Sequence, residues 1–200
     1  MLTLNGVPAL TFADLCQRAY REGPSFATRQ GCEVLLGAVA GRTCLAFRGS
    51  LGGLDWLTDG RFCPWHDRYS GLWYPRGFLI GARSMWGLIG PAAWLRDGAY
   101  LTGHSKGAAE AYVFAAHMLA AGLRVHGIVT FGSPRPGLTS GLAERLCGIP
   151  KLRIVNRGDQ VTDVPPWWLG FYHVGGATKV GKGWDIALDH PMEAYRKALA

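Results

Sequence analysis

The sequence has few charged residues and no cluster of basic ones. Only 18% of its 200 residues are charged, and the 21 Lys and Arg residues are spread along the chain instead of forming a run. Because nucleic-acid binding depends on gathered cations, this scatter argues against a nucleic-acid partner although the net charge is +7. The charge excess is consistent with solubility or with a weak attraction to an anionic membrane surface.

Cysteine is scarce and shows none of the spacings typical of a disulfide framework or a metal site. The five cysteines are odd in number, and no C-x-x-C pair occurs. Cys63-Pro-Trp-His66 resembles half of a metal site, but the chain has no second half. We therefore expect reduced, mostly buried thiols, no metal and no cofactor. The cysteines are Cys16, Cys32, Cys44, Cys63 and Cys147.

Long hydrophobic runs are missing as well. The N-terminus has no basic residues followed by an apolar stretch, which argues against a secretory signal. Every apolar stretch is interrupted by a charge, Gly or Pro before it reaches the roughly 18 residues of a membrane-spanning helix. The sequence predicts a cytoplasmic protein or one released by a route other than the general secretory pathway. Its oligomeric state stays open.

The chain has the composition of one globular domain, 1–200, because 48% of its residues are hydrophobic. Strands and helices alternate from residue 99 onward, which is typical of an α/β protein whose mostly parallel central sheet is flanked by helices. The expected helices are 11–21, 77–96, 105–121 and 191–199, and Gly90-Pro91 is a point where the second of them can be interrupted. The expected strands are 33–40, 42–47, 99–102, 125–131 and 151–156, with a hairpin over 171–180; residues 51–76 are expected to be irregular and rich in aromatics.

The stretch Gly103-His104-Ser105-Lys106-Gly107 has the G-x-S-x-G pattern of a nucleophile elbow between a strand and a helix. Such a turn holds the serine in a strained conformation, and Gly103 and Gly107, two residues to either side, must be glycine because a Cβ would clash. Ser105 is therefore predicted to be an exposed nucleophile at a helix N-terminus. The backbone N–H of Lys106 is the expected donor to an oxyanion, and Ser50, just after an early strand, is the expected second donor.

A serine nucleophile requires a histidine base and an acid that orients it, and in α/β-hydrolases both follow the serine in the chain. His117 lies in a helix and His126 begins a strand, so His173 and His190 remain. We favour His190, because it lies in a loop before the last helix. For the acid we favour Asp159, in a loop after a strand, over Asp163.

These stretches together resemble the class 3 lipase family, which contains fungal triacylglycerol lipases and many bacterial lipases. The resemblance is carried by Phe47-Arg48-Gly49-Ser50, by the elbow, by Thr130-Phe131-Gly132-Ser133-Pro134-Arg135 and by the loop from Val155 to Pro166. It implies an α/β-hydrolase fold and places the acid at Asp159, not Asp163, and the base at His190, not His173. Residues 51–76 are not the family's usual amphipathic lid helix, and Arg76 stands where the family often has histidine.

The leading hypothesis is a serine esterase that hydrolyses lipid carboxylic esters, either acylglycerols or phospholipids, through an acyl-Ser105 intermediate. Four apolar residues of the segment 51–76 are candidates for contact with an acyl chain or a lipid surface. A small-ester or thioester hydrolase is the second enzyme hypothesis, and a catalytically silent binding protein is the third. The four candidates are Leu51, Trp56, Leu57 and Trp65.

Overall fold

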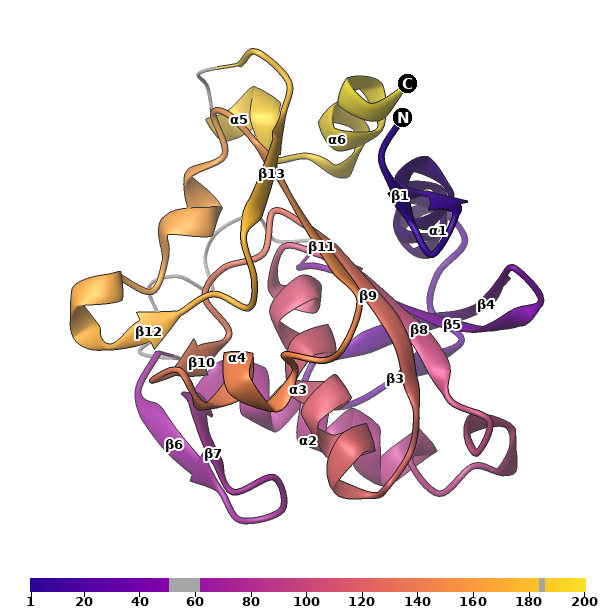
Figure 1. The fold of residues 1–200 in the computed structure, drawn as a ribbon, viewed down its shortest axis with the longest axis vertical. Helices are drawn as coiled ribbons and strands as arrows, with labels where there is room; N and C mark the ends of the chain where they lie inside the picture. Colours follow the sequence, from indigo (N-terminus) through magenta and orange to yellow (C-terminus); the bar gives the residue numbers. More distant parts are fainter. Residues whose placement is uncertain (51–61, 184–185) are drawn as a thin grey trace.

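The computed structural model describes residues 1–50, 62–183 and 186–200, with only the backbone of Ile186. Its centre is a seven-stranded sheet in the order β13-β11-β9-β8-β5-β4-β3, in which the neighbours from β13 to β5 are parallel and β4 and β3 are antiparallel (Figure 1). The strands are β3 Phe26–Ala27, β4 Glu33–Val39, β5 Arg42–Phe47, β8 Ala99–His104, β9 Val125–Phe131, β11 Lys151–Asn156 and β13 Ala177–Val180.

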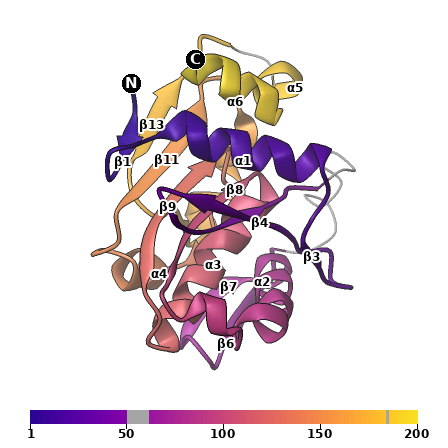
Figure 2. The ribbon, with the colours of Figure 1, turned by 90° about the vertical axis from the view of Figure 1, so that its right-hand side faces the viewer.

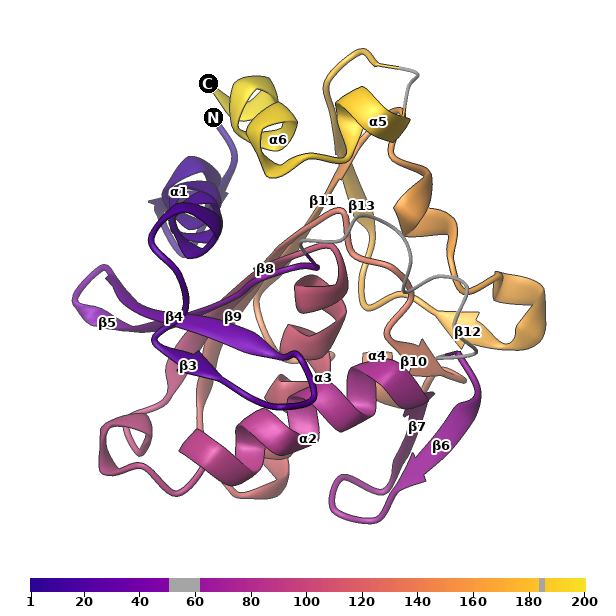
Figure 3. The ribbon, with the colours of Figure 1, turned by 180° about the vertical axis from the view of Figure 1, so that it is seen from behind.

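Helices cover both faces of this sheet. Helices α1 (Ala9–Arg21) and α6 (Met192–Leu199) pack on one face, and α2 (Arg76–Ile89) and α3 (Lys106–Ala120) on the other (Figure 3). Figure 2 shows α1 and α6 side by side, with the two ends of the chain close together. Two buried clusters result, one between each helix pair and the sheet.

The central strands are apolar because both of their faces are covered. Every residue of β8 and β9 is buried, as expected for parallel strands between two helical layers. The register pairs Phe47 of β5 with Gly103 of β8, and His104 of β8 with Phe131 of β9. The carboxyl ends of these three strands therefore meet at one edge, where the loops that follow them converge.

The α/β-hydrolase-like fold class is confirmed, and so is the pairing of 33–40 with 42–47 as β4 and β5. The first helix begins slightly earlier than expected, at Ala9. The helix expected over 77–96 is interrupted at Gly90-Pro91, the break that the sequence allows: α2 ends at Ile89, and a separate 3-10 turn, η2 (Ala93–Leu95), follows. Proline cannot continue a helix because it lacks the N–H donor, which accounts for the break.

The hairpin expected over 171–180 is wrong. Strand β12 (Phe171–Tyr172) pairs antiparallel with β10 (Gly137–Leu138), whereas β13 pairs parallel with β11. The two runs do have β-strand character, but each finds a partner far away in the sequence. Local propensity predicts that a segment is extended and does not predict which strand it joins.

Part of the segment expected to be irregular is a hairpin of β6 (Pro64–Asp67) and β7 (Leu72–Pro75). Asp67 organises its turn, since the carboxylate accepts hydrogen bonds from the N–H and the hydroxyl of Ser70, and Gly71 adopts a positive φ of 73°. Short elements complete the chain: β1 Thr3–Leu4, β2 Val7–Pro8, α4 Gly141–Arg145, η3 Gln160–Asp163, η4 Trp167–Leu169 and α5 Ile186–Asp189.

Within the described part of the chain, no helix combines the length and the apolar character that crossing a lipid bilayer requires.

Candidate active site

The turn between β8 and α3 has the geometry of a nucleophile elbow. Ser105 is held at φ 56° and ψ −131°, a conformation that residues with a side chain rarely adopt. A Cβ at Gly103 would lie 2.7 Å from the Gly107 carbonyl oxygen, and a Cβ at Gly107 would collide with the carbonyl oxygens of Phe47 and Arg48. Both positions therefore require glycine, so that the elbow fits between its own helix and the end of β5.

The structure brings the three predicted triad side chains together. The Nε2 atom of His190 lies 2.9 Å from Oγ of Ser105, and its Nδ1 atom lies 2.8 Å from Oδ2 of Asp159. A carboxylate only accepts hydrogen bonds, so Nδ1 carries the proton and Nε2 is free to accept one from the serine. His190 reaches the serine from the loop between α5 and α6, and Asp159 from the loop after β11.

Asp159 is fixed by further donors, and Asp163 is directed elsewhere. The backbone N–H of Val161 donates to Oδ1 of Asp159 at 2.9 Å, and the Tyr195 hydroxyl donates to Oδ2 at 2.5 Å. The Asp163 side chain is 76% exposed and lies 3.8 Å from the guanidinium of Arg135. Asp159 is buried and in contact with the histidine, so it is the carboxylate that can orient the base.

Tyr195 was not predicted from the sequence, although it contacts the acid directly. It is completely buried on α6, and its oxygen also accepts from the backbone N–H of Asn156 at 3.1 Å. Burial and the charge of Asp159 hold the pKa of Tyr195 well above its usual value, so the hydroxyl keeps its proton and remains a donor. The apolar face of the last helix was the available signal, but it does not show which loop the tyrosine meets.

Gly132 directly follows β9 and packs against the acid and the base of the triad. It has a φ of 59°, and a Cβ there would lie 2.5 Å from Oδ2 of Asp159 and 3.3 Å from Nδ1 of His190. The position therefore demands glycine both for its backbone conformation and for the space that the acid and base occupy.

A second hydrogen-bonded chain runs beside the triad. The Tyr20 hydroxyl accepts from the backbone N–H of Gly49 at 3.0 Å and lies 2.7 Å from Nδ1 of His104, whose Nε2 lies 2.7 Å from the carbonyl oxygen of His190. That carbonyl can only accept, so Nε2 of His104 is protonated and Nδ1 accepts from the tyrosine. Burial lowers the pKa of His104 to about 3, which keeps the ring neutral.

His173 and His117 have hydrogen-bond partners other than the triad. His173 bonds through Nε2 to the carbonyl oxygen of Thr162 at 2.9 Å, and burial lowers its pKa to about 3. His117, on α3, bonds through Nε2 to Oδ2 of Asp67 at 2.9 Å and thereby ties the β6–β7 hairpin to the helix. Neither ring contacts Ser105 in the hydrogen bonds of the described residues.

Both predicted oxyanion donors belong to segments that meet at the elbow. Lys106 is the first residue of α3, and its ammonium is held by Oε1 of Glu110 at 2.7 Å and by the Gly31 carbonyl oxygen at 2.8 Å. Ser50 directly follows Gly49, whose Cα is so close to the elbow that an added Cβ would lie 2.9 Å from Cβ of Ser105. The β5 loop thus passes against the nucleophile, where a donor to an oxyanion is required.

Three of the four candidates for acyl or lipid contact, Leu51, Trp56 and Leu57, lie outside the described residues. The fourth, Trp65, is on β6 and is 49% exposed. The guanidinium of Arg76 lies 5.0 Å from the centroid of its ring, a cation–π contact. Trp65 therefore has a polar neighbour as well as an exposed apolar face.

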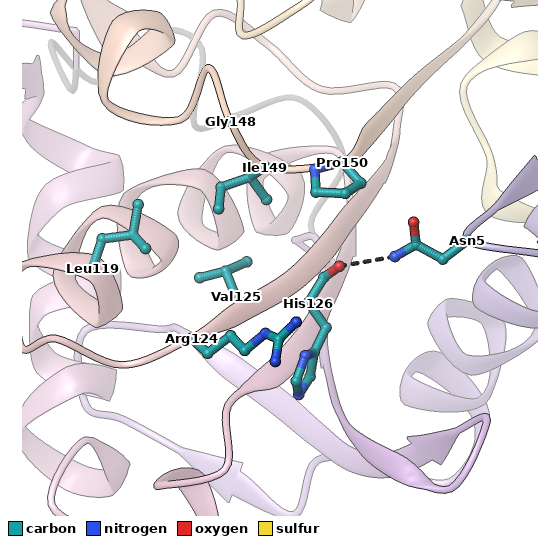
Figure 4. A pocket seen from close by; sticks show the side chains of 8 residues that line it. All are labelled: Asn5, Leu119, Arg124, Val125, His126, Gly148, Ile149 and Pro150. Carbon is teal, nitrogen blue, oxygen red and sulfur yellow. Dashed lines mark hydrogen bonds between the residues drawn. The ribbon is translucent and has the colours of Figure 1, made fainter.

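A cavity of about 510 Å³ lies at the opposite edge of the sheet, where β9 begins (Figure 4). Its lining includes Arg124, Val125 and His126, together with Ile149 from the segment just before β11. The side-chain amide of Asn5 also lines it and donates a hydrogen bond to the His126 carbonyl oxygen at 3.0 Å. It is separated from Ser105 by the length of the central strands and takes no part in the site described above.

Residues 96–168 match the sequence model of the family described as lipase (class 3). This part of the chain is similar to the class 3 lipase family. The class 3 lipase segment contains the elbow and Asp159, whereas His190 lies beyond it. None of the curated proteins matches the chain at a significant level.

Solved structures of fungal lipases share the fold. Rhizomucor miehei triacylglyceride lipase is 21% identical with a TM-score of 0.70, over 86% of this chain and 77% of that one. Lipase II from Rhizopus niveus is 22% identical with a TM-score of 0.70, over 88% and 79%. The lipase from Rhizopus microsporus var. chinensis is 21% identical with a TM-score of 0.70, over 85% and 72%. A serine bonded to this base and acid, in a segment that matches the class 3 lipase model, supports the activity of a carboxylic ester hydrolase.

Proposed function

We propose that this protein hydrolyses lipid carboxylic esters, acylglycerols or phospholipids, through an acyl-serine intermediate. The observation that carries the proposal is the chain of contacts from Ser105 through His190 to Asp159, at 2.9 and 2.8 Å. Such a geometry turns a weakly nucleophilic hydroxyl into one that attacks an ester at neutral pH.

In the first half of the reaction, Oγ of Ser105 attacks the ester carbonyl carbon while Nε2 of His190 takes the serine proton. Asp159 stabilises the imidazolium that forms and keeps the ring oriented. The N–H of Lys106 and the N–H or hydroxyl of Ser50 stabilise the oxyanion. The tetrahedral intermediate then collapses, His190 protonates the leaving alcohol, and the acyl group remains on the serine.

In the second half, a water molecule gives a proton to Nε2 of His190 and attacks the acyl carbon. The new tetrahedral intermediate expels Oγ of Ser105, which recovers its proton from the imidazolium. The products are a carboxylic acid and an alcohol, and the enzyme returns to its starting state.

Two features favour lipid over small soluble esters. The structures that share the fold include a triacylglyceride lipase, and the segment after Ser50 is rich in aromatic residues. The net charge of +7 supports a peripheral contact with an anionic membrane surface. Hydrolysis of small esters or thioesters is the second candidate, supported by the same triad and separated from the first by substrate preference.

The test is a series of nitrophenyl esters from acetate to palmitate, with fluorophosphonate labelling of the intact chain and of Ser105→Ala. We expect a preference for long acyl chains, one label per molecule, and a loss of about 10⁴- to 10⁶-fold in kcat with no label in the variant. A preference for acetate would favour the small-ester alternative. Absence of both label and turnover in the intact chain would contradict the assignment as an enzyme.

Acylglycerols and phospholipids are separated by a second measurement. Fatty acid released from emulsified triacylglycerol is compared with that released from phospholipid vesicles, with Ser105→Ala as the blank for both. The lipid that is hydrolysed with the higher kcat/KM is the assigned substrate class.

A further inference from the structure

Three consecutive apolar residues are strongly exposed on η4. The exposed fractions of Trp167, Trp168 and Leu169 are 63%, 70% and 60%. Isolated exposed apolar residues are ordinary. Two tryptophans and a leucine exposed in succession indicate a surface that binds an apolar partner. We call these three residues the apolar tip.

The apolar tip is a folded turn and not a loose loop. The Leu169 N–H donates to the Pro166 carbonyl oxygen at 3.2 Å, and Gly170, at φ 85°, ends the turn with a hydrogen bond to Trp167. The Thr139 N–H donates to the Gly170 carbonyl oxygen at 2.7 Å and so anchors the turn to the loop after β10. The indoles are thus presented outward by the backbone, at little further cost in conformational entropy on binding.

The apolar tip lies on the same side of the molecule as the triad. It follows the acid loop by a few residues, at the edge toward which β8, β9 and β11 run, and it projects beside β12 (Figure 1; Figure 3). Two more exposed apolar side chains belong to elements of this side, Tyr172 of β12 and Leu188 of α5, which directly precedes the His190 loop. A partner that docks on these side chains would therefore lie on the Ser105 side of the molecule.

Basic side chains accompany the apolar surface at this edge. Arg157 is exposed in the turn that also carries Asp159, and Lys182 is exposed just past the end of β13, the strand parallel to β11. The exposed Asp163 opposes them, but its carboxylate is close to Arg135. Exposed indoles and exposed cations on one side of the molecule fit the interface of an anionic bilayer, where tryptophan prefers the headgroup level and cations meet lipid phosphates.

We propose that the apolar tip inserts into the interface of a phospholipid bilayer that contains anionic lipid and so presents the Ser105 edge to the membrane. The proposal rests on the proposed function, since it supplies the orientation in which a lipid ester reaches the serine. Trp65, which was expected to meet lipid, is on the neighbouring β6–β7 hairpin and is not required for it.

The experiment separates docking from chemistry. Binding is measured by sedimentation with phosphatidylcholine vesicles, with and without phosphatidylglycerol, using chains that carry Ser105→Ala so that no lipid is consumed. Turnover of nitrophenyl acetate, a soluble ester, is measured with the serine intact. Each assay compares the parent chain, the double variant Trp167→Ala/Trp168→Ala, and Trp94→Ala, which removes a partly exposed tryptophan from η2 at the opposite edge.

We expect the double variant to bind vesicles at least about tenfold more weakly, because two indoles no longer leave water, while its soluble-ester turnover stays within about twofold. Trp94→Ala should bind like the parent, and omission of phosphatidylglycerol should weaken binding of the parent. Unchanged binding of the double variant, or equal loss in Trp94→Ala, would overturn the proposal. So would a parent chain that is dimeric when the double variant is monomeric.

Failure of the proposed function has a different signature. If the chain with an intact serine turned over no ester, while vesicle binding still depended on the apolar tip, the docking surface would stand and the assignment as an esterase would fall. If the esters were hydrolysed but binding ignored the apolar tip, only the docking surface would fall.

Discussion

The ring of His104 donates a hydrogen bond from Nε2 to the backbone carbonyl oxygen of His190, at 2.7 Å, and the two rings lie 4.8 Å apart. The residue before the nucleophile thus supports the loop that carries the base. Tyr20 extends the connection to Gly49, beside the predicted oxyanion donor Ser50. Base, nucleophile and oxyanion loop are therefore positioned by one chain of hydrogen bonds that uses none of the three triad side chains.

Removal of the Tyr20 hydroxyl should test this connection. Tyr20→Phe leaves the ring but not the link between His104 and Gly49, and misplacement of the catalytic groups by a fraction of an ångström should lower kcat by about 10- to 100-fold. KM should change by less than about threefold, because no group that binds the substrate is lost. Steady-state kinetics on a soluble ester give both values.

The control for Tyr20→Phe is Tyr112→Phe. Tyr112 is also buried, and its hydroxyl is hydrogen-bonded to Thr130 at 3.0 Å, but it lies on α3 away from His190. Both variants should lose a similar amount of stability, of about 1 kcal/mol. A kcat that falls equally in the two would show that Tyr20 acts through stability alone.

The acid can be assigned by two matched substitutions. Asp159→Asn should reduce kcat by about 10⁴-fold, since an amide does not stabilise the imidazolium and favours the wrong histidine tautomer. Asp163→Asn should leave kcat within about twofold, because that carboxylate is exposed and contacts Arg135 instead of the base. An active Asp159→Asn enzyme with an inactive Asp163→Asn enzyme would reverse the assignment.

Gly132→Ala should impair the active site without removing any catalytic group. The added Cβ would press on Oδ2 of Asp159 and on the hydroxyl of Tyr195, at 2.5 and 3.0 Å. We expect kcat to fall by at least about 100-fold as the acid and base shift. Gly122→Ala is the control, because that glycine also has a positive φ, 73°, but has open space around its Cβ position. It should lose only about 1 kcal/mol of stability and keep its activity.

The buried neutral histidines predict a stability that decreases in acid. The pKa of His173 is lowered by burial, and by Arg153 and Arg135, from 6.5 to about 3. Between these values the unfolded state binds a proton that the folded state does not, so the free energy of unfolding falls as the pH decreases from about 6.5 toward 3. His104, with a pKa of about 3, adds a contribution of the same sign.

His173→Gln removes one of these titrations and keeps a donor for the Thr162 carbonyl. Urea unfolding at about pH 7 and about pH 4 should show a smaller acid-induced loss in the variant than in the parent, by about 1 to 3 kcal/mol. Identical losses in the two proteins would mean that the His173 ring is not kept neutral in the fold. Activity on a soluble ester should be unchanged, since the ring does not contact the triad.

The sequence by itself determined the parts of this protein whose chemistry is local. The elbow requires two glycines around a serine, a parallel strand between helical layers requires an apolar run, and a base and an acid must follow in loops at strand ends. These requirements are expressed in residue types and spacing, which is why the sequence alone predicts Ser105, Asp159 and His190 as the catalytic residues. The same reasoning paired β4 with β5, because a tight turn joins them.

Only the tertiary structure decided the contacts between segments far apart in the chain. Tyr20, His104, Tyr195 and Gly132 come from α1, β8, α6 and the end of β9, and nothing in their local sequence indicates that they meet. The partners of β12 and β13 were mistaken for the same reason, and the exposure of the apolar tip depends on how η4 is anchored on Thr139. Local patterns indicate which interactions a residue can make. The packing of the two helical layers on the sheet decides which residues become its partners.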